Sequence, residues 1–247
     1  KGGDRDYSIF ATRQRMRNSM INQGFDVVEV NLTEIKDVPT EINILLIPEM
    51  RQAMTDDELA AVDRFIERGG NLVVLADVGR QEEMNPLLAR LGMRIKEGQI
   101  AQPSTVNPYH LVLSRGTQLA ADTLKGPYRT MRANLKIHAV TMPGAVALEV
   151  VDTTVFKPMV LLSTDTLQTW IETKTTDFVE ETPVCDSISG ERISSYPTAV
   201  ALTRMHNGKQ QRFLVLGDAD CWSNAELLAS RKGINAHNFP MIPNAFR

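Results

Sequence analysis

The stretch INILLIPEMRQAMTDDELAAVDRFIERGGNLVVLAD, residues 42–77, decides the expected fold because it joins two apolar runs through one amphipathic segment. Residues 42–48 and 71–76 are short runs without polar alternation, which is typical of strands buried on both faces. Between them, apolar residues recur at helical spacing, at Leu59, Val62, Phe65 and Ile66. A strand, a helix and a strand in this order predict a parallel pair of strands with a crossover helix.

The helix in this stretch carries its own start and stop signals. Thr55 and Glu58 have the spacing of a capping box, in which each side chain accepts a bond from the other residue's backbone N–H. Gly69 and Gly70 follow the last apolar residue and are expected to end the helix.

The flanking sequence continues the alternation of helix and strand. Ser8 is a candidate cap for a helix over residues 8–22, and residues 25–32 (FDVVEVNL) read as a strand. Pro86 is expected to open a short helix that Gly92 closes. These elements predict an α/β fold whose first part forms a sheet with helices on both faces.

The middle of the chain has a different pattern. Residues 140–151 and 156–163 read as strands separated by turns, and the polar segment 173–197 is expected to be a long loop. Two strands follow, over residues 198–205 and 211–217, and Asn207-Gly208 between them is a strong hairpin signal.

The expected architecture is a three-layer, mostly parallel, flavodoxin-like sheet with a β-rich middle insertion. We expect a single α/β domain over residues 1–247, with its core in residues 1–100 and 196–247 and the β-rich insertion or subdomain in residues 101–195.

Composition narrows the functional classes. The formal net charge of −3 gives no electrostatic basis for nucleic-acid binding. Two cysteines, Cys185 and Cys221, are too few for a disulfide framework. We expect them to be unbonded, because one lies in the polar loop and the other at the edge of the core. The sequence has no apolar run close to the roughly 18 residues that span a bilayer.

The segment GDADCWSN after the last expected strand resembles an active site. A cysteine near a helix start can be a nucleophile, but Asp218 and Asp220 beside Cys221 would raise the pKa of its thiol. The two aspartates could instead hold a metal. A structural reading is also available, because Ser223 and Glu226 form a second capping-box pattern.

The best-argued binding site is the crevice beyond the carboxyl ends of the strands, where open α/β sheets bind ligands. Candidate ligand-binding residues there are Glu49, Asp77, Arg80, Asp218, Asp220 and Asn224. The sequence contains no P-loop, no GxGxxG motif and no paired histidines, so we assign no cofactor, no metal and no catalytic residue.

Several segments in order resemble a known family. They are the opening KGGD, GFDVVEVNL, VPTEINILLIPEMRQAMTDDELAAVDRFIERGGNLVVLAD, MVLLSTDTLQTW and RFLVLGDADCWSN. Together they resemble the extracytoplasmic domain of the gliding-motility-type auxiliary component of bacterial ABC transporters. The likeness is strongest over residues 38–77 and weakest over residues 99–136.

This resemblance implies a class I glutamine-amidotransferase-like fold, related to a domain in an intraflagellar-transport subunit. It also implies a location at the periplasmic face of the inner membrane, with anchoring transmembrane helices outside both ends of this chain. The implied partners are the membrane permease and the ATPase subunits of an ABC system. The family brings no established catalytic residues, and the amidotransferase cysteine elbow is absent from this sequence.

We therefore expect a non-enzymatic accessory domain of an ABC-type transport or gliding-motility system, which binds a protein partner or an envelope ligand such as a saccharide or a peptide. Two alternatives stay open. One is a hydrolase or transferase that uses a metal at Asp218 and Asp220. The other is a saccharide-binding module, for which Trp170 and Trp222 could supply a platform.

Overall fold

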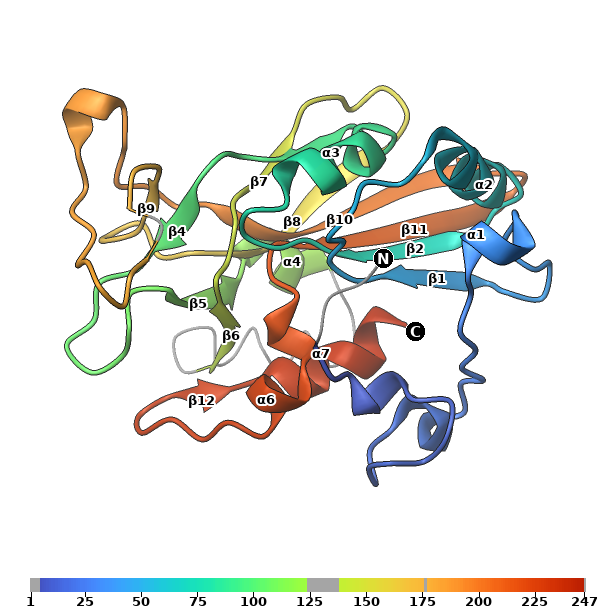
Figure 1. Cartoon of the computed structure of the whole chain (residues 1–247), viewed down its shortest axis with the longest axis horizontal. Helices are drawn as coiled ribbons and strands as arrows, with labels where there is room; N and C mark the ends of the chain where they lie inside the picture. Colours follow the sequence, from blue (N-terminus) through green and yellow to red (C-terminus); the bar gives the residue numbers. More distant parts are fainter. Residues whose placement is uncertain (1–4, 124–137, 176, 247) are drawn as a thin grey trace.

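The structure is a computed structural model that describes residues 5–123, 138–175 and 177–246 (Figure 1). Its main element is an eight-stranded sheet in the order β1-β2-β11-β10-β8-β5-β6-β12. These strands are β1 (Ile44–Ile47), β2 (Asn71–Leu75), β5 (Leu111–Gly116), β6 (His138–Pro143), β8 (Lys157–Ser163), β10 (Pro197–His206), β11 (Lys209–Leu216) and β12 (Asn235–Ala236). Two short pairs flank it, β3 (Met93–Ile95) with β7 (Leu148–Val150) and β4 (Gln99–Ala101) with β9 (Trp170–Glu172).

The strand–helix–strand unit predicted at residues 42–77 is confirmed. β1 and β2 pair in parallel, and α2 (Asp56–Glu67) connects them. The Thr55 hydroxyl accepts from Glu58 N–H, and the Glu58 carboxylate accepts from Thr55 N–H, so the predicted capping box is complete. After the helix, Gly69 has a φ of 98°, a left-handed conformation that glycine adopts without strain.

The predicted three-layer, mostly parallel, flavodoxin- or amidotransferase-like sheet is wrong. Among the described strands of the main sheet, four of the seven neighbouring pairs are antiparallel. The cause lies in β5, β6 and β8, which come from the middle of the chain and extend the same sheet next to β10. The sheet curls as it passes from β10 to β6 (Figure 1), and the described residues contain more strand than helix.

The β10–β11 hairpin is confirmed and explains where the antiparallel half begins. Asn207 and Gly208 have φ values of 49° and 77°, which are the left-handed conformations that a tight two-residue turn requires. Such a turn makes β10 antiparallel to β11, whereas β11 itself pairs in parallel with β2. The hairpin therefore marks the change from parallel to antiparallel pairing.

Each strand divides its side chains between the two faces of the sheet. Leu72 and Val74 pack in one core cluster with α2 and α3 (Gln81–Ala89), while Val73 and Leu75 pack in the other. The second cluster includes the N-terminal segment, η4 (Asp220–Trp222) and α7 (Asn238–Ala245). Figure 1 shows α2 and α3 above the sheet, and α7 with the N-terminal segment below it.

Two predictions near the N-terminus are wrong. Residues 8–22 do not form one helix; the structure has two short 3-10 turns, η1 (Ser8–Phe10) and η2 (Met20–Gln23). Residues 25–31 pair with no strand, and the helix α1 (Leu32–Ile35) begins where the expected strand would end. Ile9 and Met20 are nevertheless fully buried, so the apolar pattern identified core residues but not their local structure.

Four smaller points complete the description of the chain. Pro86 lies inside α3, which begins at Gln81, so Pro86 does not open that helix. Two further short helices are α4 (Gln118–Thr123) and α6 (Asn224–Leu227). The predicted opening motif at residues 1–4 lies outside the described residues. Within the described residues, no helix is both long enough and apolar enough to cross a membrane.

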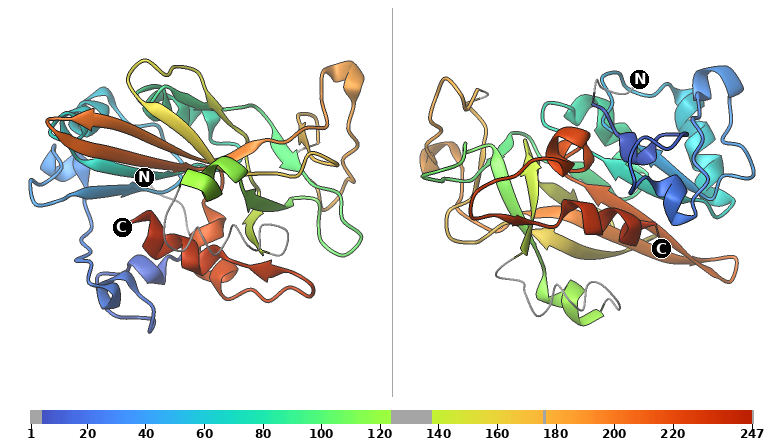
Figure 2. Two further views of the ribbon diagram at one scale, coloured as in Figure 1. Left: turned by 180° about the vertical axis from the view of Figure 1, so that it is seen from behind. Right: turned by 90° about the horizontal axis from the view of Figure 1, so that it is seen from below.

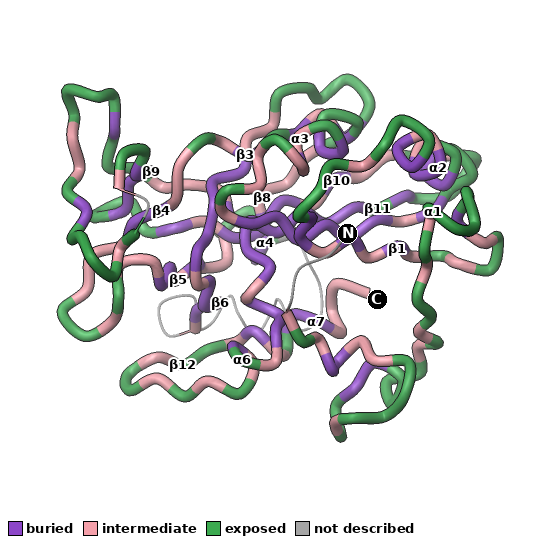
Figure 3. Tube along the Cα trace, in the orientation of Figure 1, coloured by how far each residue is buried: buried purple, intermediate pink, exposed green. Residues whose placement is uncertain are grey.

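The predicted long loop after β9 is confirmed. Its only regular element among the described residues is η3 (Ser187–Ser189). Both views in Figure 2 show this loop, in orange, standing away from the body of the molecule. Figure 3 shows that the loop is mostly exposed, whereas the central strands are buried.

Candidate functional site

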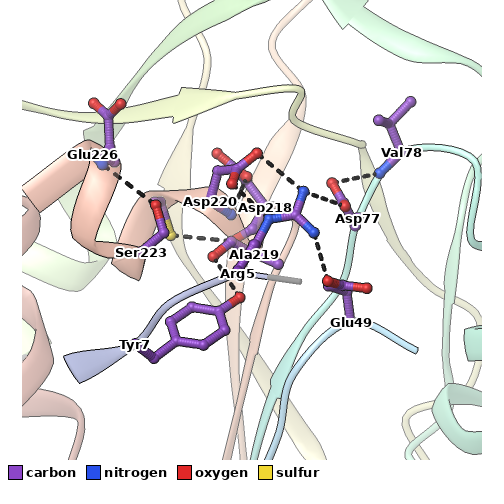
Figure 4. Close-up of polar contacts among 11 residues, drawn as sticks. Arg5, Tyr7, Glu49, Asp77, Val78, Asp218, Ala219, Asp220, Ser223 and Glu226 are labelled. Carbon is purple, nitrogen blue, oxygen red and sulfur yellow. Dashed lines mark hydrogen bonds and ion pairs between the residues drawn. The ribbon is translucent and has the colours of Figure 1, made fainter. Parts of the chain in front are cut away.

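Three parallel strands bring four acidic residues to one edge of the sheet. Glu49, Asp77 and Asp218 each lie two residues beyond the end of a strand, namely β1, β2 and β11. Asp220 begins η4 directly after them. Because β1, β2 and β11 run in parallel, their carboxyl ends meet, and the four predicted residues converge (Figure 4).

A residue that the sequence did not point to, Arg5, occupies the centre of this group. Its Nη1 lies 2.6 Å from Glu49 Oε1, and its Nη2 lies 2.6 Å from Asp77 Oδ2. Asp220 receives two bonds, from Nε at 2.5 Å and from Nη2 at 3.0 Å. One guanidinium thus joins three carboxylates that come from three separate segments (Figure 4).

Burial sets the electrostatics of the site. Burial raises the pKa of Asp77 to about 6, although the charge of Arg5 acts in the opposite direction. Burial also disfavours the charge of Arg5, but its bond to Asp220 and the charges of Asp77 and Asp220 outweigh this, and the pKa of Arg5 is raised. Arg5 therefore stays cationic at every pH at which the protein is folded.

Asp218 lies deeper than the other three acids, and its carboxylate binds the backbone rather than Arg5. Its Oδ1 accepts from the backbone N–H of Asp220 at 2.7 Å, which is the turn-stabilising role considered for it. Its side chain is fully buried, and burial together with the charges of Asp220 and Asp77 raises its pKa well above the usual value. Two oxygens at the site, Asp218 Oδ2 and Glu49 Oε2, are buried and have no hydrogen-bond partner among the described residues.

Asn224 holds the segment that carries Arg5. Its backbone N–H donates to the carbonyl of Asp6, its Oδ1 accepts from Ser8 N–H, and its Nδ2 donates to Ser8 Oγ. The hydroxyl of Tyr7 donates to the carbonyl of Ala219 at 3.0 Å. Asn224 is thus a positioning residue for the N-terminal segment at the edge of the site.

Arg80 takes a different position from the other predicted residues. It immediately precedes α3, and its buried Nε has no hydrogen-bond partner among the described residues. Arg80 is not part of the ion pairs around Arg5. The structure therefore brings five of the six predicted residues together next to the N-terminal segment, and Arg80 is the exception.

Cys221 is unsuited to nucleophilic chemistry. It is fully buried, and its thiol donates to the carbonyl oxygen of Asp218. Burial first, and then the charges of Asp218 and Glu226, raise the pKa of the thiol well above its usual value. Cys185 is partly exposed and also free, so the prediction that the two cysteines are unbonded is confirmed.

The second capping-box pattern is only half formed. Ser223 Oγ accepts from the backbone N–H of Glu226 at 3.3 Å. The Glu226 carboxylate instead binds Arg231 through both oxygens and accepts from the hydroxyl of Thr141. The Ser223 half of the predicted capping box is therefore present, whereas the Glu226 side chain connects α6 to β6 through Thr141.

The carboxylates of Glu49, Asp77 and Asp220 form a cation site, and the guanidinium of Arg5 occupies it. Within the described part of the chain, no three histidine, cysteine or carboxylate side chains are arranged to hold a metal ion. Asp220 is paired with Arg5, and Asp218 faces its own turn. Trp170 and Trp222, the residues considered for a saccharide platform, are both buried.

A groove of about 640 Å³ adjoins the site. Asp6 and Pro48, which neighbour Arg5 and Glu49 in the sequence, are part of its lining. Its other walls come mainly from the N-terminal segment, at Tyr7, Ser8, Phe10, Ala11, Thr12, Arg13 and Arg15, with Glu29.

Comparison with known families decides the wider relationship. Residues 3–246 match the model of a family of ABC transport auxiliary components, which is described as an ABC-type uncharacterized transport system. The chain belongs to this family. This auxiliary component therefore has a general role in an ABC-type transport system, as its resemblance implied.

Solved structures show a likeness in fold. The mmIFT52 N-terminal domain superposes with a TM-score of 0.58 at 13% identity, covering 84% of this chain and 80% of that one. The likeness to this intraflagellar-transport domain is one of fold. A putative ThuA-like protein from Bacteroides uniformis has a TM-score of 0.47 at 15% identity, covering 92% of this chain and 79% of that one. The auxiliary component matches no curated protein sequence.

Proposed function

We propose that this auxiliary component is a binding domain at the periplasmic face of the inner membrane, in an ABC-type transport system of the gliding-motility kind. It contacts the permease directly and is associated with the ATPase through that subunit. The observation that carries a binding role is Arg5, which neutralises the acidic crevice from within the chain. Cys221 is fully buried and the Asp218 carboxylate accepts from the backbone N–H of its own turn, so neither is placed as an exposed nucleophile or base.

The surface for the permease is formed by the turn before β9, residues 165–169, and the described residues of the loop after β9, up to residue 193. Exposed aliphatic side chains are concentrated on it, at Leu167, Val179, Val184, Ile188 and Ile193. Exposed apolar groups on a projecting loop are typical of a protein interface. Acidic side chains accompany them, at Asp165, Asp177, Glu180 and Glu181. Because this charge opposes contact with an anionic lipid surface, we assign the loop to a protein partner with basic groups around an apolar patch.

Co-purification from membranes tests this role. The tagged full-length protein, extracted in mild detergent, should recover the permease and the ATPase. A Val184→Asp/Ile188→Asp variant should recover at least tenfold less, because it places charge in the apolar contact. Met205→Asp is the matched control, since Met205 is 70% exposed and lies at the other end of the molecule, near the tip of the β10–β11 hairpin.

Two results would contradict the proposal. One is a wild-type protein that recovers neither subunit. The other is a protein that external protease cannot reach in spheroplasts, because the proposed domain faces the periplasm.

A further inference from the structure

We call the four acids around Arg5 the socket (Glu49, Asp77, Asp218 and Asp220). The chain positions Glu49, Asp77 and Asp218 without help from Arg5. Asp77 Oδ1 accepts from the backbone N–H of Val78 at 2.9 Å, and Asp218 Oδ1 accepts from that of Asp220. Glu49 is buried where the chain leaves β1. The strand ends and these local bonds therefore keep these three acids in place when the occupant of the socket changes.

The geometry of the socket matches a guanidinium better than an ammonium ion. The carboxylates of Glu49, Asp77 and Asp220 approach Arg5 from different directions, and Asp220 engages two of its nitrogens. A planar fork with five N–H donors can meet all three carboxylates together. A lysine ammonium is a compact charge with three donors at one atom, so it can satisfy only part of this arrangement.

The socket also holds more acceptors than Arg5 uses. Glu49 Oε2 and Asp218 Oδ2 are buried and have no hydrogen-bond partner among the described residues. Leaving such groups unpaired is costly, so they favour a ligand that brings additional donors. A peptide that carries an arginine supplies both the guanidinium and backbone N–H groups.

The site is open to solvent on the side of Arg5. The side chains of Arg5 and Asp220 are 21% and 33% exposed, whereas that of Glu49 is 1% exposed. The adjoining groove of about 640 Å³ is lined largely by the segment that carries Arg5. A ligand entering from the groove would therefore displace this segment rather than a strand of the sheet.

We propose that the socket is a receptor for an arginine side chain of a protein partner, and that Arg5 occupies it in cis until the partner's arginine replaces it. This inference rests on the proposed function, because it takes the ligand to be part of a partner protein. Beyond the proposed function, it specifies that the recognised group is a guanidinium and that Arg5 competes with it for the socket.

The test uses ethylguanidinium as the probe and the full chain with Arg5→Gln, which empties the socket while keeping much of the aliphatic stem. We expect roughly 10–20 mM ethylguanidinium to raise the Tm of this variant by several degrees, because a ligand that binds only the folded state stabilises it. The wild-type protein should not respond, because Arg5 fills its socket. Butylammonium at the same concentration should give less than half of the shift.

A second variant shows whether the response comes from the socket. Arg5→Gln/Asp77→Asn should lose it, whereas Arg5→Gln/Asp26→Asn, with the change at an exposed acid away from the socket, should keep it. If Arg5→Gln does not fold, Arg5→Lys is measured instead, and a smaller stabilisation by ethylguanidinium is expected because the lysine partly competes.

A folded variant at position 5 that shows no stabilisation, or an equal response when Asp77 is replaced, would overturn the proposal. This outcome is separable from failure of the proposed function. Normal recovery of the permease with no probe binding would contradict only the socket, whereas probe binding without recovery of the permease would contradict only the transport role.

Discussion

Arg5 and Asp220, which are 215 residues apart in the chain, form a two-point ion pair in which Nε lies 2.5 Å from Oδ1 and Nη2 lies 3.0 Å from Oδ2. This pair joins the N-terminal segment to the turn after β11. Because Glu49 and Asp77 bind the same guanidinium, one side chain connects the ends of three strands.

Replacing Arg5 should therefore destabilise the protein. Arg5→Ala removes the cation from three carboxylates that are partly or fully buried, and we expect it to lower the free energy of unfolding by about 3 kcal/mol at pH 7. Urea denaturation followed by circular dichroism measures the change. The control is Arg13→Ala, at an exposed arginine of the same segment. Equal and small effects of the two substitutions would show that the ion pairs add nothing to stability.

The pH dependence of stability should carry the signature of Asp77. Its pKa is about 6 in the folded protein and near 3.8 when unfolded, so between these values the folded state binds more protons than the unfolded state. The free energy of unfolding should consequently fall as pH rises from about 4 to about 6, by up to about 3 kcal/mol from this group.

Asp77→Asn removes this contribution because the amide does not titrate. The free energy of unfolding of the variant minus that of wild type should therefore be larger at pH 7 than at pH 4. Denaturant unfolding of both proteins at the two pH values measures this difference. Asp26→Asn, at an exposed acid, serves as the control and should leave the slope unchanged. A wild-type slope that persists in Asp77→Asn would show that another group is responsible.

The capping box at the start of α2 should contribute measurably to stability. Thr55→Ala removes the hydroxyl that accepts from Glu58 N–H, and we expect a loss of about 1 kcal/mol. The comparison is Thr40→Ala, at an exposed threonine outside any helix, which should change the free energy of unfolding by no more than about 0.5 kcal/mol. The same loss in both variants would mean that the cap is not responsible.

The two cysteines should differ in reactivity. In the native protein, iodoacetamide should label Cys185, slowly at pH 7 and faster at pH 9, because burial and nearby Glu191 and Glu172 raise the pKa of this thiol. Cys221 is fully buried and should react only after unfolding.

Mass spectrometry should find one tag on the native protein and two on the unfolded protein without reductant. Cys185→Ser should leave the native protein unlabelled. Rapid labelling of Cys221 in that folded variant would contradict its burial and reopen a catalytic role.

Local sequence was sufficient wherever neighbouring residues decide the structure. Thr55 with Glu58 predicted the start of α2, and Asn207-Gly208 predicted the hairpin, because capping and tight turns depend on side chains and φ preferences within a few residues. The apolar runs of β1 and β2 were equally clear. For the site, the ends of three expected strands were enough to group Glu49, Asp77, Asp218 and Asp220.

Tertiary contacts decided the rest. The apolar periodicity of Ile9 and Met20 is compatible with a helix, but packing against the lower face of the sheet places them in two separate turns. The direction in which β5, β6 and β8 join β10 is likewise a long-range choice, so alternation of strands and helices did not reveal the antiparallel half of the sheet.

The sequence by itself therefore determined the β1–α2–β2 unit, the hairpin, the buried positions and the acids at the strand ends, all of which follow from short-range patterns. Only the tertiary structure decided the mixed sheet and the place of Arg5. An arginine in the opening segment has no local signal for its partners, because Coulomb attraction and hydrogen bonding act through space, and its three carboxylates come together only after the strands have paired.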